Sequence, residues 1–407
     1  MNIAILTTAR SDFGPLKRVI RRAADHFHVS LLIAGSHFLP SRGRTIGEIK
    51  EEFEDTPNVA LVSFDAMVDG NSASDHITTL SVTQSMASRW FDSNVCDLLL
   101  FLGDRWELWG VTLPAFLHGI PLAHVSGGEV TEGVIDDAVR HSHSKLSALH
   151  FVATDAYAAN LSLMGEEDWR ITVSGECGLD QIYDLEVSTP QEVKARFSID
   201  LAKDILLVTY HPATLDCAAS VEAQIHSLLL ALESFSDCQL VFTAPGMEQG
   251  SQIVLNAIQE FVAKHASARF VEHLGSRNYL AVLRAAKVVI GNSSSGLVEA
   301  ASFGVPAVNI GARQKNRIAA DSVQHVGYSS SEIKSAIERA LANDYQHFSR
   351  ICPNPYDPFR DGKNSDRIVD VLVNALTLLP RQHLLMKKFD NRTYAESWNS
   401  LLSRGDH

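Results

Sequence analysis

Short runs of consecutive apolar residues recur along the chain, and each is followed by a loop and then by a segment with the apolar spacing of a helix. In the first half these runs are Asn2–Thr8, Phe27–Ala34, Val59–Ser63, Asp97–Leu102, Pro121–Val125 and His150–Ala153. No hairpin signals join them, and near-continuous apolar runs are typical of strands buried on both faces. The pattern therefore predicts an α/β fold with a parallel, doubly wound sheet, whose ligands bind beyond the carboxyl ends of the strands.

The strand rhythm stops between Gly178 and Asp204, where Pro190 precedes a charged, helix-like segment. A second series follows, at Ile205–Tyr210, Gln239–Thr243, Arg269–Val271, Val288–Ile290 and Ala307–Ile310. Because 407 residues exceed the length of one ordinary core, we expect two Rossmann-like domains that face each other across a cleft. We place the domains at residues 1–185 and 186–362, and we expect residues 363–407 to supply a last helix that crosses back to the first domain.

The composition is that of a soluble globular protein, with 45% hydrophobic and 20% charged residues. The sequence lacks both an apolar run of about 20 residues and the architecture of a signal peptide, so we expect a cytoplasmic protein with no membrane partner. Its five cysteines are scattered without C-x-x-C spacing. That arrangement predicts reduced thiols and no zinc site.

The formal net charge is −13, and no block of basic residues interrupts the acidic excess. Nucleic acid is therefore not expected as a partner. A small anionic ligand is compatible with this charge if cationic side chains gather locally. The candidates for such a group are Arg10, Arg105, Arg313 and Arg317.

The stretch that begins at Gly291 predicts a phosphate site. An apolar run stops at this glycine, three serines follow, and then a short helix begins, so backbone N–H groups and the positive end of a helix dipole meet there. Ser293 and Ser294 add small donors, and Glu299 is placed to accept from ribose hydroxyls. Arg313 follows in the next loop and suits a diphosphate through bidentate contacts. The alternative is an ordinary capped turn between a strand and a helix.

Polar residues also follow several strands of the first half. They are Arg10, His37, Asp104, Arg105 and Glu129. Since the carboxyl ends of parallel strands share one edge of a sheet, we expect a site there as well.

Each acidic candidate also has a structural interpretation. Asp104 and Asp136 suit the N-terminal caps of the helices that follow them, and Glu129 suits a loop anion paired with Lys145 or Arg140. His211, which precedes a proline, suits a buried structural histidine.

Six segments in order resemble the hydrolysing UDP-N-acetylglucosamine 2-epimerases of sialic and legionaminic acid pathways. They are Thr8–Gly14, Leu102–Arg105, Gly127–Asp137 with Arg140, His141 and Lys145, then Thr209–Leu215, Gly291–Arg317 and Asn354–Tyr356. The resemblance spans nearly the whole chain and implies the glycosyltransferase-B architecture. It also implies a UDP-sugar ligand, no cofactor, no metal and a homodimer or homotetramer.

The resemblance implies a two-step reaction. UDP leaves C1 while a base removes the C2 proton, which gives a 2-acetamidoglucal, and water then adds to release the free manno-configured sugar. Asp104, Glu129 and Asp136 would be the acid–base set, with their individual steps left open. His211 would bind phosphate or move a proton from the second domain.

The same resemblance implies the residues that bind the nucleotide. They are Arg10, Arg105, Leu274, Ser293, Ser294, Glu299 and Arg313, with Arg317 as a further candidate. Leu274 would contact the uracil through its backbone, Glu299 the ribose, and the serines and arginines the phosphates.

The chain departs from the family pattern at three places. Pro245–Glu248 replaces Pro-Asn-x-Asp, so a contact made by that asparagine is absent or comes from Glu248. Ser126 stands where a Glu or His is usual in the family. Trp106 and Trp109 follow Asp104 and Arg105, where smaller or phenolic residues are more usual. The substrate is therefore left open between UDP-N-acetylglucosamine and its 2,4-diacetamido-2,4,6-trideoxy relative.

Three other functions stay open alongside a hydrolysing epimerase. They are a non-hydrolysing epimerase, a glycosyltransferase of the same architecture, and a nucleotide-sugar-binding protein without activity. The long acidic segment Gly127–Asp137 argues against the first of these.

Overall fold

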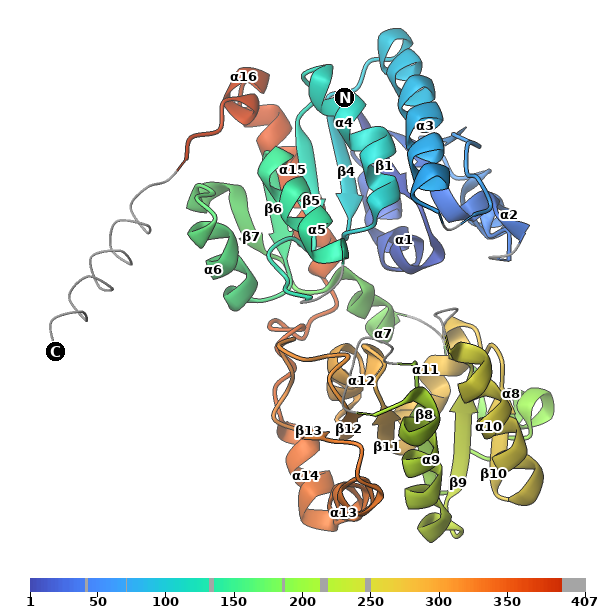
Figure 1. Ribbon diagram of the computed structural model, residues 1–407. Helices are drawn as coiled ribbons and strands as arrows, with labels where there is room; N and C mark the ends of the chain where they lie inside the picture. Colours follow the sequence, from blue (N-terminus) through green and yellow to red (C-terminus); the bar gives the residue numbers. More distant parts are fainter. Residues whose placement is uncertain are drawn as a thin grey trace, which may run out of the picture. The chain divides into compact units, whose positions relative to one another are not determined.

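The computed structural model describes residues 1–40, 43–70, 72–131, 135–184, 187–212, 219–245 and 250–389. The chain divides into two compact units (Figure 1). The first is formed by Met1–Val130, Val134–Gln181 and Asp361–His407, and the second mainly by Ile182–Arg360.

The first unit contains a seven-stranded parallel sheet in the order β3-β2-β1-β4-β5-β6-β7. Its strands are β1 (Asn2–Thr7), β2 (His28–Ile33), β3 (Val59–Ser63), β4 (Leu98–Leu102), β5 (Leu122–Val125), β6 (Leu149–Val152) and β7 (Ile171–Val173). Its helices are α1 (Arg10–Ala24), α2 (Ile46–Phe53), α3 (Ala73–Ser93), α4 (Trp109–Leu117), α5 (Ile135–Leu146), α6 (Asp155–Leu163), α7 (Gln181–Asp184), α15 (Asn364–Leu378) and α16 (Arg381–Leu385).

Alternate residues of the central strand β1 enter two separate cores, one on each face of the sheet. Ile3 and Ile5 pack in a core with α1 and α15, whereas Ala4 and Leu6 pack in a core with α3 and α4. This double burial explains why the strand is apolar throughout instead of alternating.

The last described helices belong to the first unit, although they follow the whole second unit in sequence (Figure 1). The buried carboxylate of Asp180 accepts hydrogen bonds from the backbone N–H groups of Asn364 and Ser365, at 2.9 and 2.6 Å. These bonds satisfy two donors at the start of α15. Ile368 and Leu372 then pack in the same core as α1.

The second unit contains a six-stranded parallel sheet in the order β10-β9-β8-β11-β12-β13. Its strands are β8 (Ile205–Thr209), β9 (Gln239–Thr243), β10 (Ala268–Val271), β11 (Ala286–Gly291), β12 (Ala307–Ile310) and β13 (Val323–Val326). Its helices are α8 (Pro190–Phe197), α9 (Val221–Leu232), α10 (Ser251–Lys264), α11 (Ser276–Ala285), α12 (Ser295–Val298), α13 (Ser330–Leu341) and α14 (Asn343–Ile351). One face packs against α9, α10 and α13, and the other against α8, α11 and α12.

The prediction of two parallel, doubly wound α/β domains is confirmed. One helix start differs from the apolar spacing. The apolar spacing predicts a helix over Thr78–Asn94, but α3 begins at Ala73, because Ser72 and Asp75 form a reciprocal capping box.

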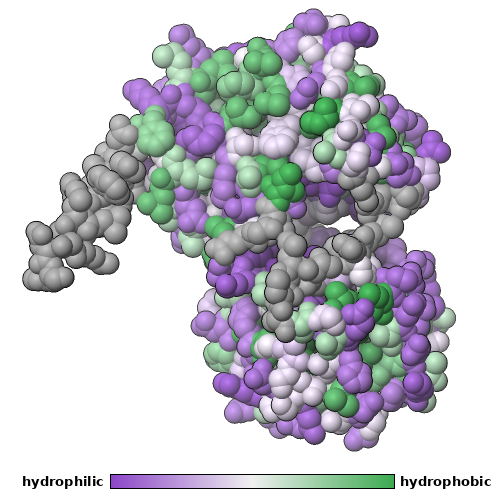
Figure 2. All heavy atoms as spheres, in the orientation of Figure 1, coloured by the Kyte–Doolittle hydropathy of each residue, from purple (hydrophilic) through white to green (hydrophobic). Residues whose placement is uncertain are grey.

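None of the described helices combines the length and the apolarity needed to cross a bilayer. Polar residues cover much of the visible face of both units (Figure 2).

Candidate active site

An ion pair gathers the acidic residues of the first unit. Arg140, in α5, is only 4% exposed, and its guanidinium donates to the carboxylate of Asp104, which follows β4. The same guanidinium donates to the backbone carbonyl of Glu129 at 3.1 Å and lies 3.6 Å from Asp137. Arg140 thus ties the ends of β4 and β5 to the first turns of α5.

Glu129 is 5% exposed and follows a turn that only glycine can form. Gly128 has a φ of +73°, and a Cβ there would lie 2.4 Å from the carbonyl oxygen of Tyr157. Asn160 also donates to the Gly128 carbonyl at 2.8 Å. The left-handed backbone of Gly128 and its hydrogen bond with Asn160 therefore fix the turn that precedes Glu129.

Asp136 lies in the first turn of α5 and is partly buried. Burial raises the pKa of its carboxyl, the nearby Arg105 cation lowers it, and the Glu107 carboxylate raises it, so that the net shift is upward. A carboxyl with a raised pKa retains its proton closer to neutral pH, which suits a general acid.

Arg10 stands on a turn that is held by a buried carboxylate. Asp12 accepts hydrogen bonds from the backbone N–H groups of Thr8 and Ala9, at 2.9 and 3.0 Å, and from two threonine hydroxyls. The side chain of Arg10 is 48% exposed and lies 3.5 Å from Glu48. The turn therefore presents Arg10 at the end of β1.

The strand-end residue His37 is buried beneath this turn. Its ring nitrogens lie 2.9 Å from the Thr7 hydroxyl and 2.7 Å from the Thr45 hydroxyl. Burial, together with the nearby charge of Arg105, lowers the pKa of His37 to about 4. A neutral imidazole with both nitrogens paired has a structural role here.

His211 and the phosphate-binding candidates of the second unit meet at one buried residue, Asn292. Its side-chain amide pairs with both the backbone N–H and the backbone carbonyl of His211, at 2.7 and 2.8 Å. The backbone carbonyl of Asn292 accepts hydrogen bonds from the side chains of Arg313, at 3.1 Å, and Gln314, at 3.0 Å. Asn292 thereby joins the ends of β8, β11 and β12.

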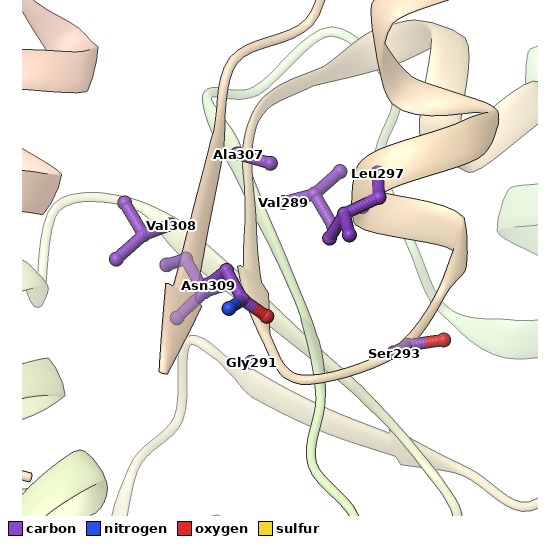
Figure 3. Close-up of a pocket in the computed structure, with 9 residues that line it drawn as sticks. Val289, Gly291, Ser293, Leu297, Ala307, Val308 and Asn309 are labelled. Carbon is purple, nitrogen blue, oxygen red and sulfur yellow. The ribbon is translucent and has the colours of Figure 1, made fainter. Parts of the chain in front are cut away.

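Gly291 allows this loop to approach β8. Its φ is +131°, and a Cβ would lie 1.9 Å from the carbonyl oxygen of Thr209. Beyond it, Ser293 lines a small pocket together with Val289 and Leu297, and its hydroxyl points away from their apolar side chains (Figure 3).

The apolar spacing of Leu297, Val298, Ala301 and Phe303 predicts a longer helix after the serines than the one that forms. Helix α12 spans only Ser295–Val298, and a 3-10 turn, η7 (Ala300–Phe303), ends at Gly304 in the left-handed conformation. One helical turn carries little macrodipole. The expected contribution of a helix dipole to anion binding is therefore small.

Glu299 lies in a small polar group with Ser295 and Tyr279. The hydroxyls of Tyr279 and Ser295 are hydrogen-bonded to each other. Burial raises the pKa of Glu299, and a hydrogen bond with Ser295 opposes that effect. The side-chain amide of Asn278 donates to the Leu274 carbonyl at 2.7 Å. This bond fixes the backbone of Leu274, which the family resemblance predicts to contact uracil.

Comparison with known proteins decides the family. A family model described as UDP-N-acetylglucosamine 2-epimerase matches residues 20–373. The chain belongs to this family. A GDP/UDP-N,N'-diacetylbacillosamine 2-epimerase (hydrolyzing) of Campylobacter jejuni is 30% identical over 351 residues, which cover 84% of this chain and 88% of the relative. A UDP-N,N'-diacetylbacillosamine 2-epimerase (hydrolyzing) of Legionella pneumophila is 31% identical over 373 residues, with coverages of 91% and 95%.

Solved structures of the family share the fold of this epimerase. The crystal structure of UDP-GlcNAc 2-epimerase from Neisseria meningitidis, bound to UDP-GlcNAc, has a TM-score of 0.72 at 18% identity. It covers 92% of this chain and is itself covered completely (100%). The chain is thus a UDP-sugar 2-epimerase with the glycosyltransferase-B type of fold.

Sequence reasoning about the epimerase missed the contacts of three residues that organise these sites. Arg140 was considered as an ion-pair partner of Glu129, whereas its guanidinium pairs with the carboxylate of Asp104 and donates to the backbone carbonyl of Glu129. Asn292 and Glu107 gave no signal, because a polar residue beside a glycine or on a helix resembles a solvent-facing one.

The departures from the family pattern fall in different environments. Trp106 stacks on His76 with ring centroids 4.3 Å apart, and Trp109 donates to the Ser142 hydroxyl at 3.1 Å. Ser126 adopts a left-handed conformation with φ of 65°. Gly246, Met247 and Glu248 lie outside the described residues. Among the described residues of the epimerase, no group of three or more His, Cys, Asp and Glu is arranged to hold a metal ion.

Proposed function

We propose that this chain is a hydrolysing 2-epimerase. It converts UDP-N-acetylglucosamine, or its 2,4-diacetamido-2,4,6-trideoxy analogue, and water into UDP and the free manno-configured sugar. The observation that carries the proposal is the group of acidic residues around Arg140, whose guanidinium pairs with Asp104, donates to the backbone carbonyl of Glu129 and lies 3.6 Å from Asp137, the chain neighbour of Asp136. The names of the two relatives at 30% and 31% identity, both described as hydrolysing, support the same reaction.

The chemistry requires three proton transfers in two steps. In the first step a base removes the proton from C2, the C1–O bond to UDP breaks, and a C1–C2 double bond forms. In the second step a water oxygen bonds to C1, a proton is delivered to C2, and the proton of the water passes to a base. Asp104, Glu129 and Asp136 are the groups proposed for these transfers, with Asp136 as the proton donor.

The nucleotide is assigned to residues of the second unit. Ser293, Ser294 and Arg313 would bind the diphosphate, since hydroxyls and a guanidinium are suitable donors to phosphate oxygens. Glu299 would accept from the ribose, and the backbone of Leu274 would contact the uracil. His211, held by Asn292, would bind phosphate or move a proton.

Arg10 and Arg105 of the first unit complete the proposed binding set. Both would contribute positive charge toward the diphosphate or the nucleotide. With them, arginines supply the charge that a metal ion supplies in many phosphate sites. The proposed assembly is a homodimer or homotetramer, which light scattering would test.

The sugar is chosen by a direct comparison of donors. The purified protein is incubated with UDP-N-acetylglucosamine and, separately, with the diacetamido analogue, and products are separated by anion-exchange chromatography. We expect stoichiometric UDP and free sugar, with the diacetamido donor favoured because both hydrolysing relatives are named for diacetylbacillosamine.

The same experiment separates the alternatives. A product that still carries UDP would indicate a non-hydrolysing epimerase, and turnover only with an added acceptor would indicate a transferase. Binding without turnover of either donor would indicate a nucleotide-sugar-binding protein. Each of these results would contradict the proposal.

A further inference from the structure

His124 is a fully buried histidine in strand β5 of the first unit, and the reaction described above does not use it. Its imidazole stacks on the ring of Phe101 in the neighbouring strand β4, with ring centroids 4.8 Å apart. A buried imidazole is unfavourable unless its nitrogens are hydrogen-bonded. The partners of these two nitrogens therefore indicate what the residue does.

The first nitrogen of His124 holds the backbone just before Asp104. Its Nε2 lies 2.8 Å from the carbonyl oxygen of Gly103. Because a carbonyl oxygen only accepts, Nε2 carries the proton and donates it. Gly103 has a φ of +91° and no side chain that would restrict rotation, so the peptide group that joins it to Asp104 needs an external restraint. The hydrogen bond from His124 supplies that restraint.

The second nitrogen of His124 faces helix α5. With the proton on Nε2, Nδ1 is an acceptor, and it lies 3.3 Å from the hydroxyl of the fully buried Ser144. The same hydroxyl lies 3.1 Å from the backbone carbonyl oxygen of Arg140, one helical turn earlier. His124 and Ser144 thus connect the backbone before Asp104 with the turn that carries Arg140, the ion-pair partner of Asp104.

The loop that leads to Glu129 packs against the same two side chains. A Cβ at Gly127 would lie 3.1 Å from Nδ1 of His124 and 3.1 Å from Oγ of Ser144, so any larger residue there would press on both. The Glu129 loop therefore meets the two segments described above at one buried pair of side chains.

We propose that His124, together with Ser144, is a positioning residue that holds the Asp104–Arg140 pair and the Glu129 loop in the geometry that the proton transfers require. The inference rests on the proposed function, in which Asp104 and Glu129 act as acid–base groups. His124 does not touch the substrate and acts through the backbone. Since acid–base groups must lie within hydrogen-bond reach of the proton, their displacement lowers kcat more than it weakens nucleotide binding.

The test compares His124→Gln with His124→Asn. The amide nitrogen of glutamine reaches about as far as Nε2 of histidine and can still donate to Gly103, whereas that of asparagine reaches only as far as Nδ1. We expect kcat of His124→Asn to fall by about 10- to 100-fold, and kcat of His124→Gln to stay within about fivefold of wild type. UDP affinity, measured by calorimetry, should stay within about twofold of wild type in both variants.

His143 offers a matched control in the same core. It is also fully buried, and its ring centroid lies 6.1 Å from that of His124. Its Nε2, however, lies 3.0 Å from the hydroxyl of Thr112 in α4, away from the strand ends. His143→Asn should therefore lower the melting temperature about as much as His124→Asn does, while its kcat stays within about threefold of wild type.

The outcomes separate this inference from the proposed function. Equal kcat in His124→Asn and His143→Asn would overturn the inference alone, and so would a His124→Gln protein that is no more active than His124→Asn. If either His124 variant fails to fold, Ser144→Ala takes its place. A kcat lower by about 3- to 10-fold in Ser144→Ala would then support the inference, and an unchanged kcat would overturn it.

A wild type that releases no UDP would overturn the proposed function instead. Crystal structures of the wild type and of the folded variant then test the positioning role without any activity. We expect the peptide group between Gly103 and Asp104 to be displaced in the variant, and an unmoved peptide would contradict the inference.

Discussion

The side-chain amide of Asn292 pairs with the backbone of His211 through two hydrogen bonds, His211 N–H to Oδ1 at 2.7 Å and Nδ2–H to the His211 carbonyl at 2.8 Å. Asn292 is fully buried, so its side-chain amide is shielded from bulk water. Strands β8 and β11 are hydrogen-bonded to each other within the sheet, and the Asn292–His211 pairing links the same two chain segments beyond their ends. It fixes the loop that carries Ser293 relative to the turn that carries His211.

The first prediction concerns this pairing. Asn292→Ala removes both bonds to the partly buried backbone of His211, so we expect kcat/KM to fall by about 10- to 100-fold, corresponding to roughly 1–3 kcal/mol. Asn292→Asp keeps the acceptor for His211 N–H but places a carboxylate against the His211 carbonyl, and it should be no better. Steady-state kinetics measure both effects, and the exposed Asn256→Ala should behave as wild type.

The second prediction concerns Asp104. Asp104→Asn keeps the shape of the side chain but removes its charge and its ability to take a proton, so turnover should fall by about 10²- to 10⁴-fold. UDP affinity, measured by titration calorimetry, should stay within about twofold of wild type because the nucleotide is assigned to other residues. Asp92→Asn, at an exposed carboxylate, is the control. Unchanged turnover in Asp104→Asn would remove Asp104 from the acid–base set.

Glu299 should distinguish ribose from deoxyribose. If its carboxylate accepts from a ribose hydroxyl, wild type should bind UDP more tightly than 2′-deoxy-UDP, and Glu299→Gln should reduce that preference. Calorimetry with both nucleotides measures the preference directly. An equal preference in wild type and Glu299→Gln would show that the carboxylate does not read the 2′-hydroxyl.

A structural prediction concerns the segment after α15, which is held by a fully buried arginine. The guanidinium of Arg170 donates to four backbone carbonyls, three of which belong to His383, Leu384 and Met386. Arg170→Ala should therefore destabilise the first unit by about 3 kcal/mol, since it leaves buried carbonyls unpaired. Thermal unfolding of Arg170→Ala should show a melting temperature lower by several degrees. The melting temperature of Arg170→Lys should lie between those of Arg170→Ala and wild type, and that of the exposed control Arg89→Ala should equal wild type.

The buried carboxylate of Glu166 should make stability depend on acid. Burial alone raises its pKa, but hydrogen bonds from His150, Lys145 and Lys387 lower it from 4.5 to about 2. A carboxyl group whose pKa is lower in the folded than in the unfolded protein stabilises the fold at pH values above the unfolded pKa. This stabilisation is lost as the pH falls from about 4.5 toward 2. The contribution is roughly 3 kcal/mol.

The measurement is a series of unfolding midpoints between these pH values. Wild type should lose stability steeply on acidification, whereas Glu166→Gln should start lower and fall less. Parallel curves for the two proteins would show that Glu166 does not control the acid response.

The sheets follow from the sequence because their central strands are buried on both faces. Strands β1, β4, β8 and β11 all carry near-continuous apolar runs, which a single sequence displays directly. The edge strands β7 and β13 do not: β7 has only three residues, and β13 includes Gln324 and His325. Their pairing depends on a neighbouring strand that is distant in sequence, so local pattern gives little signal for them.

The candidate sites show the same limit. Residues directly after strands, such as Asp104 and Glu129, can be recognised in the sequence because the apolar run of each strand ends just before them. The pairs Arg140–Asp104 and Asn292–His211 require knowledge of which strand ends are adjacent, and that information comes from the order of strands in each sheet. Glu107 was hidden for another reason, since its burial follows from the packing of a 3-10 turn that the apolar spacing does not predict.

The central claim is that UDP leaves by elimination and that water then adds to the glycal. It is tested by supplying the wild-type enzyme with its UDP-sugar in deuterated, ¹⁸O-enriched water and examining sugar and nucleotide by NMR and mass spectrometry. We predict free UDP without ¹⁸O, and a free manno-configured sugar with deuterium at C2 and ¹⁸O at C1. A free sugar that retains its C2 proton, or a product that still carries UDP, would contradict the account.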